Sequence, residues 1–170
     1  MVDPGPSMVY HGRMDTTIFT AAVEERIRSA IAYECDRQHV GLDRREFLFA
    51  AYGEAWQLSH GSSAPTGEQA LRLAGVLEPS NGGRVRSTPV TFRDGGSSAS
   101  PSDVDRLYWT LFENLPPVGA SEEEVAYWVR EFLWVHPFSD GNGRAAWLLY
   151  NWLLGAWKEP LRLPYFFGEA

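Results

Sequence analysis

The sequence predicts a compact all-α domain that carries one small β-hairpin. Apolar residues recur at spacings of three and four over several segments, which is the periodicity of amphipathic helices. Several of these segments open with Ser, Thr or Asp followed three residues later by Glu or Gln, as in a helix capping box. Among all segments, 83–92 is the most typical of a strand, and the Asp94-Gly95-Gly96 that follows is typical of a hairpin turn.

The chain length of 170 residues favours one domain with a substantial core. We expect a loose tail over 1–15, where Gly and Pro occur, and a single domain over 16–170. A first helix is expected over 16–36, because its apolar residues fall on one face, namely Phe19, Val23, Ile27 and Ile31. A second is expected to reach about Leu58, with Asp43 and Glu46 as its capping pair.

The next two helices are also marked at their ends. Thr66 with Gln69 opens a third helix that should end near Leu77. Ser100-Pro101 is a strong helix start, and Pro116-Pro117 stops the fourth helix. Its core-facing residues are expected to be Val104, Leu107, Tyr108, Leu111 and Phe112.

Two further helices flank a short polar loop. The first, 121–135, has Ser121 and Glu124 as a capping box and one buried stripe, made of Val125, Trp128, Val129, Phe132 and Leu133. The second is expected over about 143–157 and is rich in Leu, Ala and Trp. The irregular tail 160–170 is expected to dock on the body through Tyr165, Phe166 and Phe167.

The loop 136–144, His-Pro-Phe-Ser-Asp-Gly-Asn-Gly-Arg, is the candidate site. It ends at the start of a helix, where free backbone N–H groups and the positive end of the helix dipole favour anions. Gly141 and Gly143 let a ligand approach the main chain closely. The loop is therefore a plausible cradle for phosphate.

The charged and titratable residues of the loop suit the same chemistry. Arg144 offers a forked donor for phosphate, and Asp140 offers a hard oxygen ligand for Mg²⁺ held jointly with phosphates. His136, with an ordinary pKa of about 6.5, can be neutral and accept a proton at physiological pH. Phe138 is expected to anchor the loop in the core.

This loop resembles the signature of the Fic family, His-Pro-Phe-x-Asp/Glu-Gly-Asn-Gly-Arg-x-x-Arg, and the resemblance extends over about 82–154. Fic proteins are small all-helical domains, most of which transfer AMP from ATP onto a Ser, Thr or Tyr hydroxyl of a protein target. The resemblance implies that His136 deprotonates the acceptor hydroxyl and that Asp140 binds a Mg²⁺ bridging the nucleotide phosphates. It implies an anion hole made by the Gly141-Asn142-Gly143 backbone and the Asn142 side chain, with Arg144 on a phosphate of the leaving group.

The strand-like segment is similar to the flap of this family, a β-hairpin that holds an extended target segment by main-chain pairing. We expect the flap over about 83–96, with four target-binding residues, Arg86, Ser87, Thr88 and Val90. An ordinary surface hairpin is the alternative. Pro89 removes one main-chain donor, so main-chain pairing with a target can use only one register.

The last Arg of the family signature is Trp147 in this chain. In the family that Arg reaches the γ-phosphate of ATP, whereas an indole has one N–H donor and no charge. ATP could be held more weakly, another phosphate donor could stack on the indole, or the site could bind without catalysis. Alternatively Trp147 packs between helices. Because Gly-Asn-Gly is intact, nucleotidyl transfer is the favoured hypothesis.

A family inhibitory pattern, Ser/Thr-x-x-x-Glu-Gly/Asn, is matched in part by Thr20-Ala-Ala-Val-Glu24-Glu25. We interpret Glu24 as a solvated carboxylate on a helix surface. Whether a separate inhibitory partner protein exists is left open by the sequence.

Composition excludes several classes of function. The net charge of −7 argues against a nucleic-acid partner. An apolar run long enough to span a membrane and a signal-peptide core are both missing. The single cysteine, Cys35, excludes an internal disulfide, and together these features predict a cytoplasmic protein. The rival hypotheses are transfer of a different phosphate-linked group, transfer to a small molecule, and a non-catalytic nucleotide- or peptide-binding module.

Overall fold

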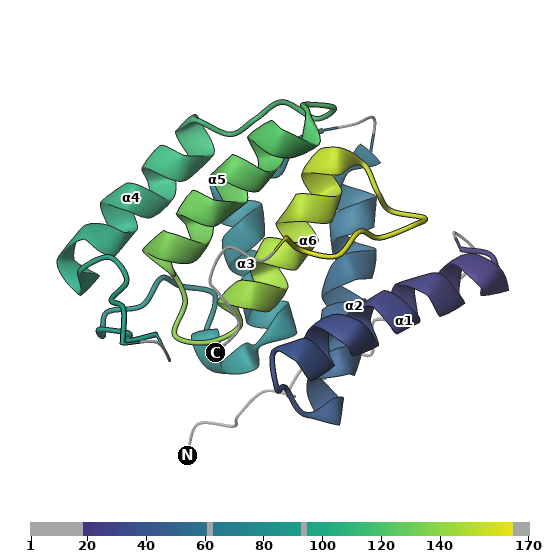
Figure 1. The fold of residues 1–170 in the computed structure, drawn as a ribbon, viewed down its shortest axis with the longest axis horizontal. Helices are drawn as coiled ribbons and strands as arrows, with labels where there is room; N and C mark the ends of the chain where they lie inside the picture. Colours follow the sequence, from purple (N-terminus) through teal and green to yellow (C-terminus); the bar gives the residue numbers. More distant parts are fainter. Residues whose placement is uncertain (1–18, 61–62, 93–94, 165–170) are drawn as a thin grey trace, which may run out of the picture.

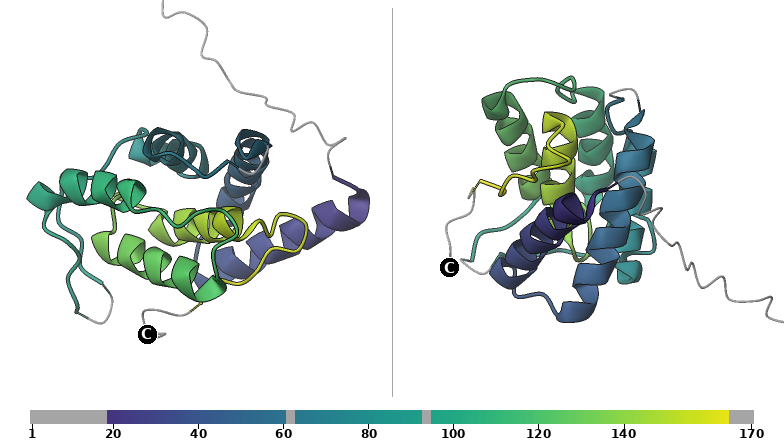
Figure 2. Two further views of the ribbon diagram at one scale, coloured as in Figure 1. Left: turned by 90° about the horizontal axis from the view of Figure 1, so that it is seen from above. Right: turned by 90° about the vertical axis from the view of Figure 1, so that its right-hand side faces the viewer.

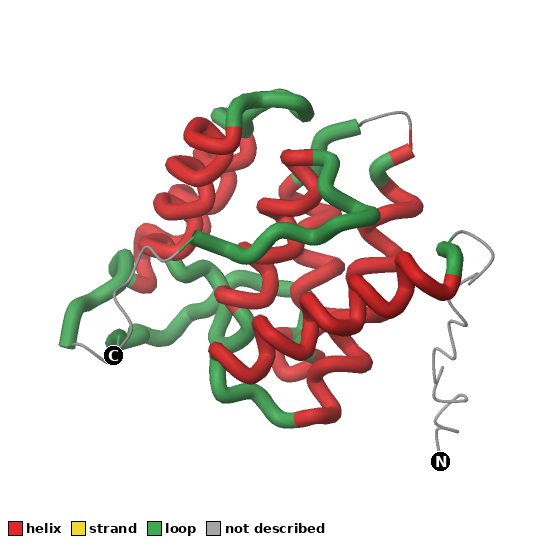
Figure 3. Tube along the Cα trace, turned by 45° about the vertical axis from the view of Figure 1, so that its right-hand side comes forward, coloured by secondary structure: helices red, strands yellow, loops and turns green. Residues whose placement is uncertain are grey.

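The computed structural model describes residues 19–60, 63–92 and 95–164. Within these residues the chain forms six α-helices and one 3-10 turn (Figure 1). The described part contains no strand, as Figure 3 shows. The predicted all-α class is confirmed.

The first two helices begin at different residues from those predicted. Helix α1 (Ala21–Arg37) starts five residues later than expected, because the Thr20 side chain caps it by accepting a hydrogen bond from the Val23 N–H at 3.3 Å. Helix α2 (Leu42–Leu58) has no side-chain cap. The predicted capping role of Asp43 is wrong, since its carboxylate pairs with Arg44 instead.

Helix α3 (Gly67–Leu77) has the predicted capping box, with Thr66 and Gln69 each accepting from the backbone N–H of the other. A single 3-10 turn, η3 (Pro79–Asn81), follows it. Helix α4 (Pro101–Glu113) begins at the predicted proline. The residues of the expected flap fall between η3 and α4.

Helix α5 (Glu122–Val135) precedes the candidate loop, and helix α6 (Asn142–Leu154) follows it. Eleven of the thirteen residues of α6 are buried, and α6 contacts α1, α2, α3 and α5. It is the central helix of the bundle, as the turned views of Figure 2 show. It ends at Gly155, in the left-handed conformation with φ 64°, and not at the predicted Trp157.

After α6 the chain turns back across the bundle (Figure 1). The Asn151 side chain bonds both main-chain groups of Leu161, accepting at 2.7 Å and donating at 3.1 Å. The Leu163 N–H donates to the buried carboxylate of Glu34 at 3.2 Å, and the Leu163 carbonyl accepts from Arg37. The predicted tail 1–15 and the aromatic residues 165–167 lie outside the described residues.

The strands of the expected β-hairpin over 83–96 are not formed by the described residues. Its described residues form one isolated antiparallel bridge, Thr91 with Ser97, and no strand. Two causes are visible in the chain. Pro89 cannot donate to a ladder, and the segment is anchored by the Arg86 side chain and not by a row of main-chain bonds.

In the described part of the chain, none of the helices combines the length and the apolar character that crossing a membrane would require.

Candidate active site

His136 closes helix α5 in an unusual backbone conformation. Its φ is 52°, in the left-handed region that side-chain-bearing residues rarely enter, and its N–H bonds the Phe132 carbonyl at 3.0 Å. The ring Nδ1 lies 3.1 Å from the Leu133 carbonyl oxygen, so Nδ1 carries the proton and Nε2 is left as the acceptor. The Phe92 ring packs edge-on against the imidazole, with 5.0 Å between the two ring centroids.

Burial lowers the pKa of His136, and the nearby Arg86 charge acts in the same direction. The bond to Leu133 and the Asp140 charge oppose this but do not reverse it. The imidazole is therefore neutral at physiological pH, which is the form that a general base requires.

The loop keeps its shape mainly through Asn142. The Asn142 side chain is buried, accepts from the Phe138 N–H at 2.9 Å and donates to the Phe138 carbonyl at 2.8 Å. Phe138 is itself fully buried, as predicted. The Asn142 amide thus acts as a brace across the loop, with both its oxygen and its nitrogen engaged by Phe138.

Gly141 sits where a side chain would not fit. Its φ is 80°, and a Cβ there would lie 2.8 Å from the Leu77 side chain. Gly143 is constrained in the same way by Gln38, whose amide oxygen would lie 2.5 Å from an added Cβ. The two glycines allow α1 and α3 to pack tightly against the start of α6.

Asp140 remains open to solvent, with a side chain 66% exposed. Its Oδ1 accepts from the Gly141 N–H at 2.7 Å. Within the described residues no group of three acidic, His or Cys side chains could hold a metal alone. A single exposed carboxylate fits Mg²⁺ when phosphates and water provide the other ligands, which is how Mg²⁺ commonly binds with nucleotides.

Arg144 is 1% exposed and reaches toward the end of α3. It donates to the Leu77 carbonyl at 3.1 Å and to the buried Glu78 carboxylate at 3.2 Å. Arg44 shares the same Glu78 oxygen at 3.0 Å. Burial alone would raise the pKa of Glu78, but hydrogen bonds from Ser80, Arg44 and Arg144 outweigh it and lower the pKa.

The Arg144 Nε is buried and has no hydrogen-bond partner among the described residues. The other two guanidinium nitrogens of Arg144 each donate to a group within the protein. In this conformation Arg144 therefore braces the loop against α3, with its charge close to the start of α6.

Asn81 is a loop-supporting residue that the sequence analysis missed. Its Nδ2 donates to the Asp140 carbonyl at 2.8 Å, and its Oδ1 accepts from the Ser139 hydroxyl and the Asp140 N–H at 2.9 and 3.2 Å. Glu78 was missed as well. Both lie about 60 residues before the loop, and no local signal in the sequence links them to it.

The four expected flap residues lie in different environments. Arg86 is buried, and its guanidinium donates to Thr88, Ala99, Val135 and His136 carbonyls and to the Ser98 hydroxyl. Ser87 and Thr88 are exposed, and Val90 is partly buried. Arg86 thus fastens the segment to the end of α5, and its side chain is not presented to a target.

Trp147 is fully buried in α6. Its ring stacks on the Tyr52 ring, with 5.6 Å between the two ring centroids, and its Nε1–H donates to the Leu161 carbonyl at 3.0 Å. This is the packing role that stood as the alternative, and the buried indole presents no surface to a nucleotide. Glu24 pairs with Arg28 one turn along α1, as expected of a surface carboxylate.

The chain matches one protein-family model and is similar to a known protein. The family model described as Fic/DOC family matches residues 68–154, which include α3, η3, the Arg86 segment, α5, the loop and α6. The chain is also similar to "Protein adenylyltransferase Fic" of Nematostella vectensis, with 35% identity over 88 residues. That match covers 49% of this chain and 20% of the relative, so the chain spans a small part of the relative's length.

Proposed function

This chain belongs to the Fic/DOC family, and from that premise we propose that it transfers AMP from ATP onto a hydroxyl group of a protein target. The observation that carries the proposal is the state of His136 at the start of the loop. Its pKa is lowered by burial, and its Nδ1 is held by the Leu133 carbonyl. A neutral imidazole with a fixed tautomer is a prepared general base.

In the proposed reaction the acceptor hydroxyl oxygen attacks the α-phosphorus of ATP. The bond between that phosphorus and the bridging oxygen to the β-phosphate breaks, and pyrophosphate leaves. The hydroxyl proton passes to His136 Nε2. Such transfers depend chiefly on positioning and charge stabilisation, which a braced loop provides.

The donor is held, in this proposal, at the start of α6. The backbone N–H groups of Asn142 and Gly143 and the helix dipole favour the phosphates. Asp140 would hold Mg²⁺, which supplies positive charge to the phosphate oxygens when bound. The likeness to a protein adenylyltransferase supports a transferase activity.

The alternative of a different phosphate-linked group rests on Trp147, since no cation stands at that position of α6. A non-catalytic module that binds nucleotide or a protein segment is the third hypothesis. Transfer of label separates them when purified protein is incubated with Mg²⁺ and a mixture of candidate acceptor proteins. ATP labelled at the α-phosphate should label an acceptor, whereas ATP labelled at the γ-phosphate should not.

Label arriving from the γ-phosphate, or from labelled CDP-choline alone, would overturn AMP transfer in favour of another group. Labelled small molecules without labelled protein would show that the acceptor is a small molecule and not a protein. If no group is transferred from any donor, but calorimetry shows that the protein binds nucleotide with Mg²⁺, the chain is a non-catalytic binding module. Asp140→Ala should abolish the Mg²⁺-dependent part of that binding.

A further inference from the structure

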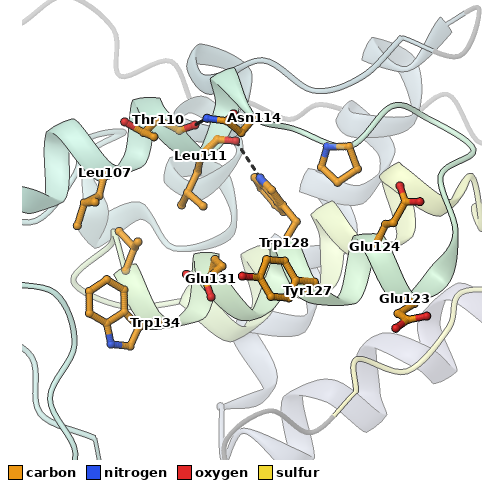
Figure 4. A pocket seen from close by; sticks show the side chains of 12 residues that line it. Leu107, Thr110, Leu111, Asn114, Glu123, Glu124, Tyr127, Trp128, Glu131 and Trp134 are labelled. Atoms are coloured by element: carbon orange, nitrogen blue, oxygen red, sulfur yellow. Dashed lines mark hydrogen bonds between the residues drawn. The ribbon is translucent and has the colours of Figure 1, made fainter.

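A groove separate from the loop runs between α4 and α5, with a volume of about 660 Å³ (Figure 4). Its floor is apolar and includes Leu107, Leu111 and the buried Trp128, whose Nε1–H donates to the Leu111 carbonyl at 2.8 Å. Because that bond fixes the indole to α4, the floor is a rigid surface.

Two large aromatic side chains on the groove are unusually exposed. Tyr127 is 65% exposed and Trp134 is 44% exposed. They stand seven residues apart on α5, which places them on the same face of the helix, and both line the groove. Exposed aromatic side chains gathered at a groove are a feature of binding surfaces.

The charge of the groove is entirely negative. Glu123, Glu124 and Glu131 line it, and none of the other described residues in its lining is Lys, Arg or His. Glu131 and Tyr127 lie close together at the middle of the groove, with Trp134 at one end and the Glu123–Glu124 pair at the other (Figure 4). A carboxylate beside an aromatic face is a favourable setting for an ammonium or guanidinium group.

We propose that this groove binds a segment of a partner protein that carries both Lys or Arg and large apolar side chains. The apolar side chains would pack on Leu107, Leu111 and Trp128, and the cationic ones would meet the three carboxylates. From Glu124 to Val135, α5 offers roughly 17 Å of groove, which suits about three helical turns. The groove ends at Val135, the residue before His136, so the bound partner lies beside the loop.

The test measures peptide binding by fluorescence anisotropy, with no nucleotide present, so that it is independent of the transfer reaction. The probe is a labelled peptide of about twelve residues made of Leu and Lys at helical spacing. Its counterpart replaces every Lys with Glu. The Leu/Lys peptide should bind, and the Leu/Glu peptide should not.

The decisive variant is Glu123→Lys with Glu131→Lys. Its matched control is Glu68→Lys with Glu25→Lys, which changes net charge equally at two exposed positions, one of them also in the first turn of a helix. The groove variant should weaken Leu/Lys peptide binding by about tenfold or more, and the control by about twofold or less. Trp134→Ala should also weaken binding, at unchanged net charge.

Equal losses in the two double variants would show general attraction to an acidic protein and would overturn the proposal. Equal binding of the Leu/Glu peptide would also overturn the proposal. A dimer in sedimentation that Trp134→Ala dissociates would overturn it too, because a second copy of the chain would then occupy the groove. If the Lys variants unfold, Glu123→Gln with Glu131→Gln removes the same charges with less repulsion, and unchanged peptide affinity in that variant would equally contradict the assignment.

Discussion

The loop 136–144 and the segment 83–99 lie against each other, yet different kinds of contact hold them. The loop is closed by short-range bonds, such as those between Asn142 and Phe138, four residues apart. The segment is fastened by Arg86, whose guanidinium reaches carbonyls 49 and 50 residues away at Val135 and His136. Part of the loop's shape therefore comes from its own sequence, with Asn81 and Glu78 supporting it from outside, whereas the segment is fastened to the end of α5.

The first prediction tests whether the loop has a chemical role beyond its shape. His136→Ala should lower the rate of AMP transfer by roughly 10²–10⁴-fold, the usual contribution of a positioned base. Nucleotide binding measured by calorimetry should persist, because the backbone N–H groups remain. Transfer at the wild-type rate would exclude the role of general base.

The second prediction tests the segment. Arg86→Met should cost about 2–4 kcal/mol of unfolding free energy, because four carbonyls lose their shared donor. Urea unfolding provides the measurement. The neighbouring exposed Ser87 is the control, and Ser87→Ala should change stability by no more than about 0.5 kcal/mol. Similar small changes in both variants would mean that water replaces the guanidinium.

The third prediction tests the brace of the loop. Asn142→Ala removes both bonds to Phe138 and should cost about 1–3 kcal/mol of unfolding free energy, together with a loss of nucleotide affinity. Asn114→Ala makes the matched comparison, because that exposed amide bonds only a carbonyl at the end of α4. If the two variants lose equal stability and both keep nucleotide affinity, the brace is unimportant.

The smallest expected effect concerns pH. The rate requires neutral His136, and burial lowers its pKa below the ordinary value of about 6.5, so the midpoint of the loss of rate on acidification lies below that pH. The value of kcat/KM at pH 6.5 should therefore exceed half of its plateau at higher pH. Phe92→Ala removes one ring packed on the imidazole and should move the midpoint upward. A wild-type midpoint above 6.5 would contradict the assignment.

These contacts also explain how much the sequence could predict. The helices, the capping box of α3, the Ser121 half of the expected box on α5 and the burial of Phe138 rest on local signals that the sequence contains, while the start of α1 and the capping of α2 were missed. The support of the loop by Asn81 and Glu78, and the anchoring by Arg86, join residues far apart in the chain. One sequence holds no spacing signal for such pairs, so residues 83–96 were predicted as a β-hairpin.

Trp147 illustrates the same limit within a single helix. It stands three residues after Arg144, at the position where the family signature has an Arg that reaches the donor. In the structure Arg144 reaches α3, while Trp147 stacks on Tyr52 and bonds Leu161. Helical spacing gives the angle between two side chains, but the neighbours that meet them come from tertiary packing.

The hydrogen bonds of Asn151 and Trp147 to Leu161 affect when α6 can complete its packing during synthesis of the chain. A growing chain exposes the loop and α6 to the solvent before Leu161 and Leu163 have left the ribosome. Until they do, the Asn151 amide oxygen, the Trp147 indole N–H and the Glu34 carboxylate lack the main-chain partners that Leu161 and Leu163 provide. The central helix therefore becomes fully seated only after the last described residues emerge, and a nascent chain stalled before Leu161 should remain sensitive to protease around α6.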